Sequence, residues 1–428
     1  MMSDKKAFNT LNAVMLGIGS MVGAGIFIVI GQAGAIAGNI VWLSFVFGGA
    51  AALLSGYSLA KLALRYPSRG GIIEYLVQSF GEGIFSGSAG VLFYLSQLIA
   101  IAAVAKSFGA YASTFMPITD HWDNVYAIGI VAIFILINLV GASLVAKSET
   151  FIVAIKISIL LFFTVVALFY VEPSLLSVAD MPPMTHMLFA VGLTFFAYQG
   201  FSVITNTVED MQNPEKTMMR AMMITIVLVG LLYILTSVAV LGNLPLSEVI
   251  HAKDYALAEA AQPIFGAIGF KIMAATALLA TASAINATLY AATEIGYTMA
   301  KDGELPEVYT YHIHSSYGGL LVSGVLILPM ILFLDLAEVT TIAALVVLII
   351  QGVTHLGHLR KIKETGANLW LVLGAALSMF SIAGLTLYHT SKSMPLIAYY
   401  MLGAFVAAFM MEFLFRVFNQ RTLKKQSS

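Results

Sequence analysis

The stretch GIGSMVGAGIFI, residues 17–28, places four glycines in a segment that is otherwise apolar enough to cross a membrane. Glycine destabilises a helix interior by roughly 0.5–1 kcal/mol relative to alanine. A break in a membrane helix also releases backbone N–H and C=O groups, which is tolerable only where a ligand, water or protein meets them. The stretch therefore predicts a membrane helix that is interrupted at a binding site.

The composition is that of a membrane protein with many helical spans. The chain has 428 residues, of which 60% are hydrophobic and 10% are charged, whereas soluble domains carry about 25% charged residues. Long continuous apolar runs predict an all-α membrane protein rather than a barrel. A net charge of −1 gives no sign of nucleic-acid binding. The lack of cysteine excludes disulfides, thiolate nucleophiles and cysteine-ligated metals.

Twelve apolar segments are long enough to be transmembrane helices. They run over residues 8–35, 38–64, 83–115, 124–145, 148–171, 185–208, 218–243, 265–300, 317–334, 337–359, 367–389 and 394–416. If the N-terminus is cytoplasmic, 16 of the 21 lysines and arginines lie on the inner side and 3 on the outer side. This bias predicts that both termini are cytoplasmic, and the short tails suggest a prokaryotic inner membrane.

A second interruption occurs at the matching place in the other half of the chain. It is TFFAYQGFSVITN, residues 194–206, centred on Gly200. Paired breaks in two halves indicate an inverted-repeat transporter and its binding site. We therefore expect a single domain, 1–428, in which residues 8–171 and 185–360 form the two repeats and residues 367–416 add two helices.

The two breaks suit the two ends of an amino acid. The half-helix after the first break would offer N-terminal amides to a carboxylate, and freed carbonyls in the sixth span would accept from an ammonium group. The alternative is helix packing, because Gly19 and Gly23 form a GxxxG motif. The first stretch alone fits both interpretations, and the second break favours a site.

Three motifs together resemble a known family. They are GIGSMVGAGIF in the first span, FFAYQGF followed by EDMQNPEKTMMRA in and after the sixth, and NATLYAATEIGYTMAKDGELPE through the eighth. In this order they are similar to the amino acid–polyamine–organocation superfamily, and in particular to its ApcT-type proton-coupled amino-acid transporters. The resemblance implies a LeuT-like 5+5 inverted repeat with discontinuous first and sixth helices, followed by two further helices.

The resemblance also implies a substrate site at the breaks. The carboxylate would meet backbone amides at Val22, Gly23, Ala24 and Gly25. The ammonium would meet carbonyls of Ser20, Met21, Phe196, Ala197 and Gln199. Gly200 would permit the second break, and Tyr198 or Phe201 would cover the substrate; the alternative for both rings is a place in the core.

Lys156 lies within FIVAIKISILLFF, about a third of the way along the fifth span. A charge in a membrane helix is costly unless it is paired or wetted, so it indicates function. The alternative is snorkelling, since the cytoplasmic end lies about seven residues or roughly 10 Å away. In ApcT-type relatives a lysine at this place fills the cation site between the first, fifth and eighth spans, which implies proton coupling through Lys156.

Other polar residues in the spans leave alternatives open. Glu294 stands where many relatives carry arginine, and is either an acid at the wet inner end of the eighth span or a gate or second proton carrier facing Lys156. Ser283 and Asn286 either line the end of the site that holds the substrate side chain or bond neighbouring helices. Lys106 is expected to snorkel to the outer surface. His355 and His358 are three residues apart but lack a third ligand nearby in sequence, so no metal site is expected.

These observations predict a secondary transporter rather than an enzyme. We expect proton-coupled symport of mainly neutral amino acids by alternating access, since Ser202 replaces an acid that many relatives carry. The alternatives are an exchanger without net proton flux and, less favoured, a membrane amino-acid sensor. The expected partners are the amino-acid substrate, protons and the lipid bilayer, with no nucleic acid and no cofactor. The functional unit is expected to be a monomer.

Overall fold

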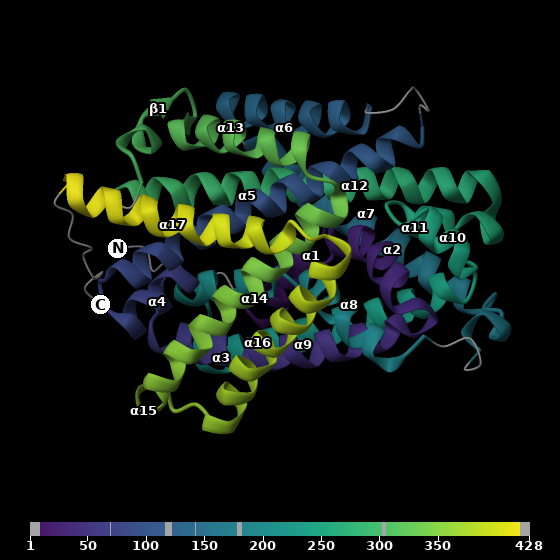
Figure 1. The fold of residues 1–428 in the computed structure, drawn as a ribbon, viewed down its shortest axis with the longest axis horizontal. Coiled ribbons are helices and arrows are strands. Elements are labelled where there is room, and N and C mark those ends of the chain that lie inside the picture. The colour runs from purple at the N-terminus through teal and green to yellow at the C-terminus, as the bar shows by residue number, and fades with distance from the viewer. Residues whose placement is uncertain are drawn as a thin grey trace.

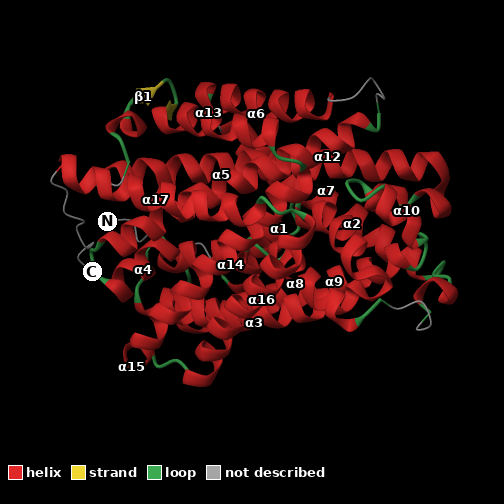
Figure 2. Cartoon of the chain, viewed as in Figure 1, coloured by secondary structure: helices red, strands yellow, loops and turns green. Residues whose placement is uncertain are grey.

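The computed structural model describes residues 9–68, 70–115, 122–141, 143–177, 182–301 and 305–419, without the side chains of residues 142–148, 415, 418 and 419. This part of the chain is helical apart from one short hairpin, in which β1 (His312–Ile313) pairs with β2 (Ser316–Tyr317) (Figure 2). The prediction of a mostly helical protein is confirmed.

The helices of the first half begin with a pair separated by a short gap. They are α1 (Thr10–Met21), α2 (Gly25–Ala37), η1 (Gly38–Ile40), α3 (Val41–Arg65), α4 (Ile72–Phe80), α5 (Ile84–Ser113), α6 (Trp122–Val140), α7 (Ser143–Leu168) and η2 (Pro173–Leu176). Gly38 has a φ of 61°, which turns the chain between α2 and α3.

The second half again begins with an interrupted helix. Its elements are α8 (Met184–Ala197), η4 (Phe201–Asp210), α9 (Pro214–Leu241), α10 (Leu246–His251), α11 (Ala256–Glu259), α12 (Gln262–Lys301), η5 (Glu307–Thr310), α13 (Gly318–Phe333), α14 (Leu336–Arg360), α15 (Ile362–Thr365), α16 (Leu369–Ser393) and α17 (Ile397–Asn419). Within α12, the backbone at Gly266 is not helical and marks a kink.

Ten helical stretches of the described chain are long and apolar enough to cross a membrane. One of them, Gly25–Arg65, contains α2, η1 and α3, and the apolar helices α1 and α13 are shorter than a full crossing. The protein is therefore a multi-pass membrane protein. Twelve spans and an inverted repeat stay predictions.

The interrupted helices lie in the centre of the bundle. α2 packs along α8, while α1 packs against η4 and α9, and α3 packs against α8 and α9. The short helices α4 and α15 lie toward one end of the long axis and α10 and α11 at the other (Figure 1). Large apolar side chains such as Phe169, Phe333 and Trp370 are exposed on the outside, as expected where lipid is the solvent.

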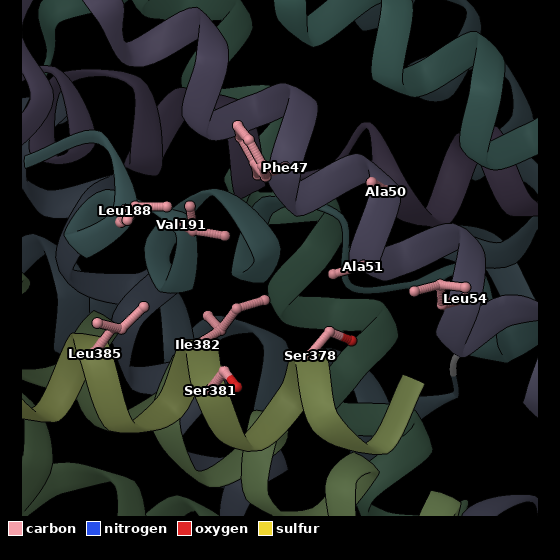
Figure 3. A pocket seen from close by; sticks show the side chains of 10 residues that line it. All are labelled: Phe47, Ala50, Ala51, Leu54, Leu188, Val191, Ser378, Ser381, Ile382 and Leu385. Carbon is pink, nitrogen blue, oxygen red and sulfur yellow. The ribbon is translucent and has the colours of Figure 1, made fainter. Parts of the chain in front are cut away.

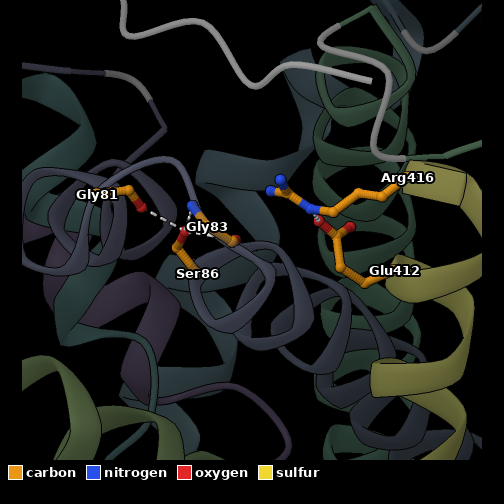
Figure 4. Close-up of polar contacts among 5 residues, drawn as sticks. All are labelled: Gly81, Gly83, Ser86, Glu412 and Arg416. Atoms are coloured by element: carbon orange, nitrogen blue, oxygen red, sulfur yellow. Dashed lines mark hydrogen bonds and ion pairs between the residues drawn. The ribbon is translucent and has the colours of Figure 1, made fainter. Parts of the chain in front are cut away.

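The last helix packs a buried carboxylate against α5. Glu412 is fully buried, and its Oε1 accepts from Arg416 Nε of the same helix at 2.7 Å (Figure 4). A Cβ on Gly87 of α5 would overlap the Glu412 carboxylate, so the close approach needs glycine there. The neighbouring Ser86 Oγ donates to Gly81 O at 2.6 Å at the start of α5. The contact between α5 and α17 is therefore specific as well as apolar.

Candidate functional site

The first break separates α1 from α2 by three residues, Val22–Ala24. Val22 N–H closes α1 by donating to Ile18 O at 2.8 Å, and helical bonding resumes when Ile28 N–H donates to Ala24 O at 3.0 Å. The N–H groups between these two bonds belong to the free end of a helix, where partial positive charge gathers. The predicted interruption of the first span is present at the glycine-rich stretch.

The second break separates α8 from η4. Gln199 N–H donates to Phe196 O at 3.0 Å, Gly200 turns the chain with a φ of 117°, and Val203 N–H donates to Gly200 O at 3.1 Å. A φ in this region strains every residue with a Cβ, so the position favours glycine. The chain then continues as a 3₁₀-helix, and the carbonyls of Ala197 and Tyr198 come at the end of the α-helical bonding.

The two breaks touch each other through their glycines. A Cβ built on Gly25 would lie 2.8 Å from Ala197 O, and one built on Gly200 would lie 2.8 Å from both the carbonyl carbon and the oxygen of Ser20. Both distances are far shorter than an ordinary van der Waals contact. Backbone from one break therefore occupies the space that a side chain on the other would need.

The other glycines of the first stretch face different neighbours. A Cβ on Gly19 would lie 3.1 Å from Val153 of α7, and one on Gly23 would lie 3.6 Å from Ala284 of α12. The stretch that breaks the helix is thus also the place where α1 and the break approach α7 and α12. The glycines therefore allow both the break and close packing, and a substrate site at the break stays a prediction.

Two carbonyls at the end of α1 accept hydrogen bonds from other helices. Tyr233 Oη of α9 donates to Met21 O at 2.7 Å, and Lys156 Nζ of α7 donates to Gly19 O at 3.3 Å. Met21 was predicted to receive a substrate ammonium, and its carbonyl already has one donor. The Ser20 carbonyl lies between these two and against Gly200.

Lys156 is buried inside the protein, so the snorkelling alternative is wrong. Its side chain is 1% exposed, and its charge interacts with Glu149, two turns earlier on α7. Ser283 Oγ of α12 donates to Glu149 Oε1. The other carboxylate oxygen, Oε2, is buried and has no hydrogen-bond partner among the described residues. Lysine, carboxylate and serine thus link α1, α7 and α12.

Glu149 was missed in the sequence. It lies at the start of the segment predicted as the fifth span, where an acid is read as a solvated end. The available signal was its spacing, because residues seven apart lie on one face of a helix. The acid therefore shares a face with the one lysine predicted to matter.

The aromatic residues of the second break lie in the core. Tyr198 is fully buried, and its hydroxyl donates to Phe45 O of α3 at 2.8 Å. Its ring packs against Phe45 and Tyr233. Phe201 is also fully buried. These contacts match the core alternative, and a covering role stays a prediction.

The remaining predicted residues bond between helices or lie near an end. Asn286 Oδ1 accepts from Asn138 Nδ2 at 2.8 Å, so Asn286, like Ser283, bonds a neighbouring helix. Glu294 is half-buried near the end of α12, and its charge interacts with Tyr317 of the hairpin. The expectation that Lys106 snorkels is wrong, because its Nζ is held by Asn124 Oδ1 at 2.7 Å and by a backbone carbonyl at 3.3 Å.

A polar contact closes the far end of α2. Gln32 Nε2 donates to Asp254 Oδ1 in the connection between α10 and α11. Burial raises the pKa of the Asp254 carboxyl above its usual value. The backbone of Lys253 also lies against Gly31, where a Cβ would collide with it. The connection therefore packs directly on the half-helix that begins at the first break.

A separate groove of about 260 Å³ lies between α3, α8 and α16 (Figure 3). Its walls are Phe47, Ala50, Ala51, Leu54, Leu188, Val191, Ser378, Ser381, Ile382 and Leu385. It offers no charged side chain to a zwitterion and no free backbone amides or carbonyls like those of the two breaks. Within the described residues no three His, Asp or Glu side chains gather as a metal site would need.

Comparison with known proteins agrees with this architecture. The profile of the family described as "Amino acid permease" matches residues 8–421. An uncharacterised protein of Methanocaldococcus jannaschii is 33% identical over 425 residues, covering 97% of each chain. The inner membrane transport protein YbaT of Escherichia coli is 35% identical over 388 residues, covering 89% of this chain and 90% of YbaT.

A more distant relative carries a named substrate. The serine/threonine exchanger SteT of Bacillus subtilis is 26% identical over 324 residues, covering 73% of this chain and 72% of SteT. The named relatives are transporters and not enzymes. The chain belongs to the amino acid permease family, within the amino acid–polyamine–organocation superfamily of membrane transporters.

Proposed function

We propose that the protein carries mainly neutral amino acids across the cytoplasmic membrane together with protons, by alternating access. The observation that carries this proposal is the buried contact between Lys156 Nζ and Gly19 O, two residues before the end of α1. It joins a titratable group directly to the half-helix that ends at the first break. Membership of the permease family supplies the substrate class.

The substrate is proposed to lie where the two breaks meet. Its carboxylate would accept from the amides at the start of α2, with Val22, Gly23, Ala24 and Gly25 around it, because a helix N-terminus favours negative charge. Its ammonium would donate to the carbonyls of Ser20 and of Ala197 and its neighbours. Met21 contributes less, because Tyr233 already donates to its carbonyl.

Lys156 is proposed to carry the coupling proton. Its charge balances that of Glu149, while its N–H bond holds Gly19 in place. Loss of the proton would leave a buried carboxylate without its partner charge, which costs several kcal/mol in a membrane interior. Protonation would therefore change the relative stability of the arrangements of α1, α7 and α12. A gating role for Glu294 is retained as part of this proposal.

The proposed topology has twelve spans, two repeats and both termini in the cytoplasm. It is supported by the distribution of lysine and arginine and by the opposite placement of α4 and α15 relative to α10 and α11 (Figure 1). The functional unit is proposed to be a monomer.

The test is uptake of labelled alanine and leucine into sodium-free proteoliposomes, with and without an inward proton gradient. We expect accumulation that depends on the gradient. Lys156→Ala should abolish it, and Lys156→Arg is the matched control, because arginine keeps the charge but does not release its proton. Gradient-driven uptake by either variant would contradict the role of Lys156.

A second outcome would identify an exchanger. The relative SteT is named a serine/threonine exchanger, and an exchanger moves labelled substrate only when unlabelled amino acid is loaded inside. Uptake that needs internal substrate and ignores the gradient would replace symport with exchange. Saturable binding without flux in any of these conditions would instead indicate a sensor.

A further inference from the structure

A chain of buried polar side chains runs between α3 and α14, on helices other than α7 and α12, which carry the Lys156 cluster. It begins at the second break and ends at α15. Its members, in order, are Gln199, Gln351, Ser55, His355, Ser58, His358 and Thr365. Both imidazoles and both serines are fully buried. So much polar surface inside a membrane protein is costly unless every bond is made.

The half of the hydrogen-bonded chain near the second break begins with two side-chain amides. Gln351 Nε2 donates to Gln199 Oε1 at 3.2 Å, and Ser55 Oγ donates to Gln351 Oε1 at 2.7 Å. Ser55 is in turn 2.9 Å from His355 Nε2. Because its only proton is donated to Gln351, Ser55 must accept from the imidazole. His355 therefore carries its proton on Nε2.

The half near α15 follows from this assignment. His355 Nδ1 is left as an acceptor, so Ser58 Oγ donates to it at 2.9 Å. Ser58 then accepts from His358 Nδ1 at 2.7 Å, and His358 Nε2 accepts from Thr365 Oγ1 at 2.9 Å. Each group donates toward the break, so the whole chain has one direction and both imidazoles are neutral.

The outer end of the chain can receive a proton without moving a helix. Thr365 Oγ1 also lies 3.4 Å from Ile362 O, which offers its hydroxyl a second acceptor. When the hydroxyl turns to that carbonyl, His358 Nε2 is free to bind a proton. Thr365 is half-buried on a short helix beyond the end of α14, so this nitrogen lies next to the surface.

The proton can then pass between the two imidazoles through one hydroxyl. It binds His358 Nε2, the proton on His358 Nδ1 moves to Ser58 Oγ, and the original Ser58 proton moves to His355 Nδ1. His358 ends neutral with its proton on Nε2, and His355 ends as an imidazolium. No bond between heavy atoms changes, and the reverse order returns the proton.

We propose that His355, Ser58 and His358 form a second proton-binding site and relay, which a proton enters from the α15 end. The protonation state of this relay would influence Gln199, in the second break, through the hydrogen-bonded chain. The inference rests on the proposed function, because it takes the break as the substrate site. Lys156 and the relay would then act on that site through different helices, the first through α1 and the second through α14.

At the end of the hydrogen-bonded chain that lies in the second break, one donor group is available to a ligand. Gln199 Nε2 is buried and has no hydrogen-bond partner among the described residues. Its amide oxygen accepts from Gln351, so the N–H groups are the part of the amide left to bond elsewhere. A substrate acceptor in the break, such as a carboxylate or hydroxyl oxygen, would complete it. Substrate and proton would thereby share one hydrogen-bonded chain.

Several elements pack against α3 and α14, and most of them carry titratable or charged groups. Those described are Tyr57, Lys61 and Arg65 of α3, Glu74 and Tyr75 of α4, Tyr94, Lys106 and Tyr111 of α5, His186 of α8 and Tyr198 after it, Glu209 and Asp210 of η4, Glu215, Lys216, Arg220 and Tyr233 of α9, Glu338 and Arg360 of α14 itself, Lys363 and Glu364 of α15, Tyr388, His389 and Lys392 of α16, and Tyr399, Tyr400, Glu412 and Arg416 of α17. Lys61 acts electrostatically on His358. Its like charge disfavours storage of the proton on His358.

The test counts the protons that move when substrate binds. Titration calorimetry of the purified full chain with alanine, in two buffers of different ionisation enthalpy, gives this count at each pH between about 4 and 8. One linked proton changes the affinity by at most about tenfold per pH unit. We expect His358→Asn to reduce both the proton count and the pH dependence, because asparagine keeps a donor toward Ser58 but binds no proton.

Two comparisons separate the relay from simple packing and from Lys156. Thr365→Val removes only the hydroxyl that donates to His358 Nε2. This nitrogen is then free to bind a proton, so the proton count should rise while thermal unfolding stays close to that of the parent. Unchanged proton counts in both variants would overturn the relay. If Lys156→Arg alone removes all proton linkage, the relay is wrong and the proposed function stands. If it removes none while His358→Asn does, the relay stands and Lys156 is not the coupling residue.

Discussion

Replacement of Gly25 by alanine should damage the site, because the added methyl would overlap backbone of the other break. The added Cβ would lie 2.8 Å from Ala197 O and 2.9 Å from Ala197 Cα. Both are backbone atoms of the opposite break, so no side chain can rotate away. Relief requires that α2 and α8 move apart, although they pack along each other.

The expected magnitude follows from the size of that overlap. Overpacking in a well-packed interior typically costs about 1–3 kcal/mol, and a displacement at the site itself weakens substrate binding about tenfold for each 1.4 kcal/mol. We therefore expect Gly25→Ala to unfold at a lower temperature in detergent micelles and to bind labelled leucine at least about tenfold more weakly.

The chain supplies matched controls. A Cβ on Gly129 of α6 or on Gly384 of α16 would meet nothing within 4 Å. Each of these substitutions should leave binding unchanged and unfolding unchanged or slightly later, since alanine is the better helix former by roughly 0.8–1.0 kcal/mol. If Gly25→Ala unfolds and binds like these two controls, the two breaks do not touch as described.

Three further experiments test contacts away from the breaks. Gly87→Ala should lower the free energy of unfolding by about 1–3 kcal/mol, because the methyl would displace the buried Glu412 carboxylate; unfolding like that of the parent would show that this contact is absent. Burial raises the pKa of Asp254, so the folded protein holds that proton more tightly than the unfolded chain and loses stability as the pH rises above about 4. Asp254→Asn should flatten this part of a melting-temperature profile, and an unchanged slope would contradict it. A double-mutant cycle on Asn138 and Asn286 should give a coupling of about 0.6–1.7 kcal/mol, and additive effects would refute their bond.

The sequence indicated the breaks because glycine and hydropathy are local signals. Four glycines in one apolar segment and Gly200 in another need no partner to be noticed. Their mutual contact could not be predicted, because Gly25 and Ala197 are brought together by packing of segments far apart in the chain. Lys156 was identified for the same local reason, since a charge inside an apolar run is conspicuous.

Residues whose role depends on a distant partner were misjudged. Lys106 was assigned to the surface from its position alone, whereas Asn124 and the carbonyl of Ile331 hold it inside. His355 and His358 were considered only as metal ligands. Their partner serines lie about 300 residues earlier on α3. The sequence of α14 therefore contains no pattern that predicts these hydrogen bonds.

The way in which the four half-helices pair has a mechanical consequence. α1 lies with η4 and α2 lies with α8, so the centre of the molecule consists of two stacked pairs joined by a few non-helical residues. An amino acid held where the pairs meet would touch both of them. Lys156 Nζ instead donates to Gly19 O in α1, and Gln32 of α2 donates to Asp254. Each pair thus has its own hydrogen bond to a neighbouring element, and breaking one of these bonds leaves the other intact.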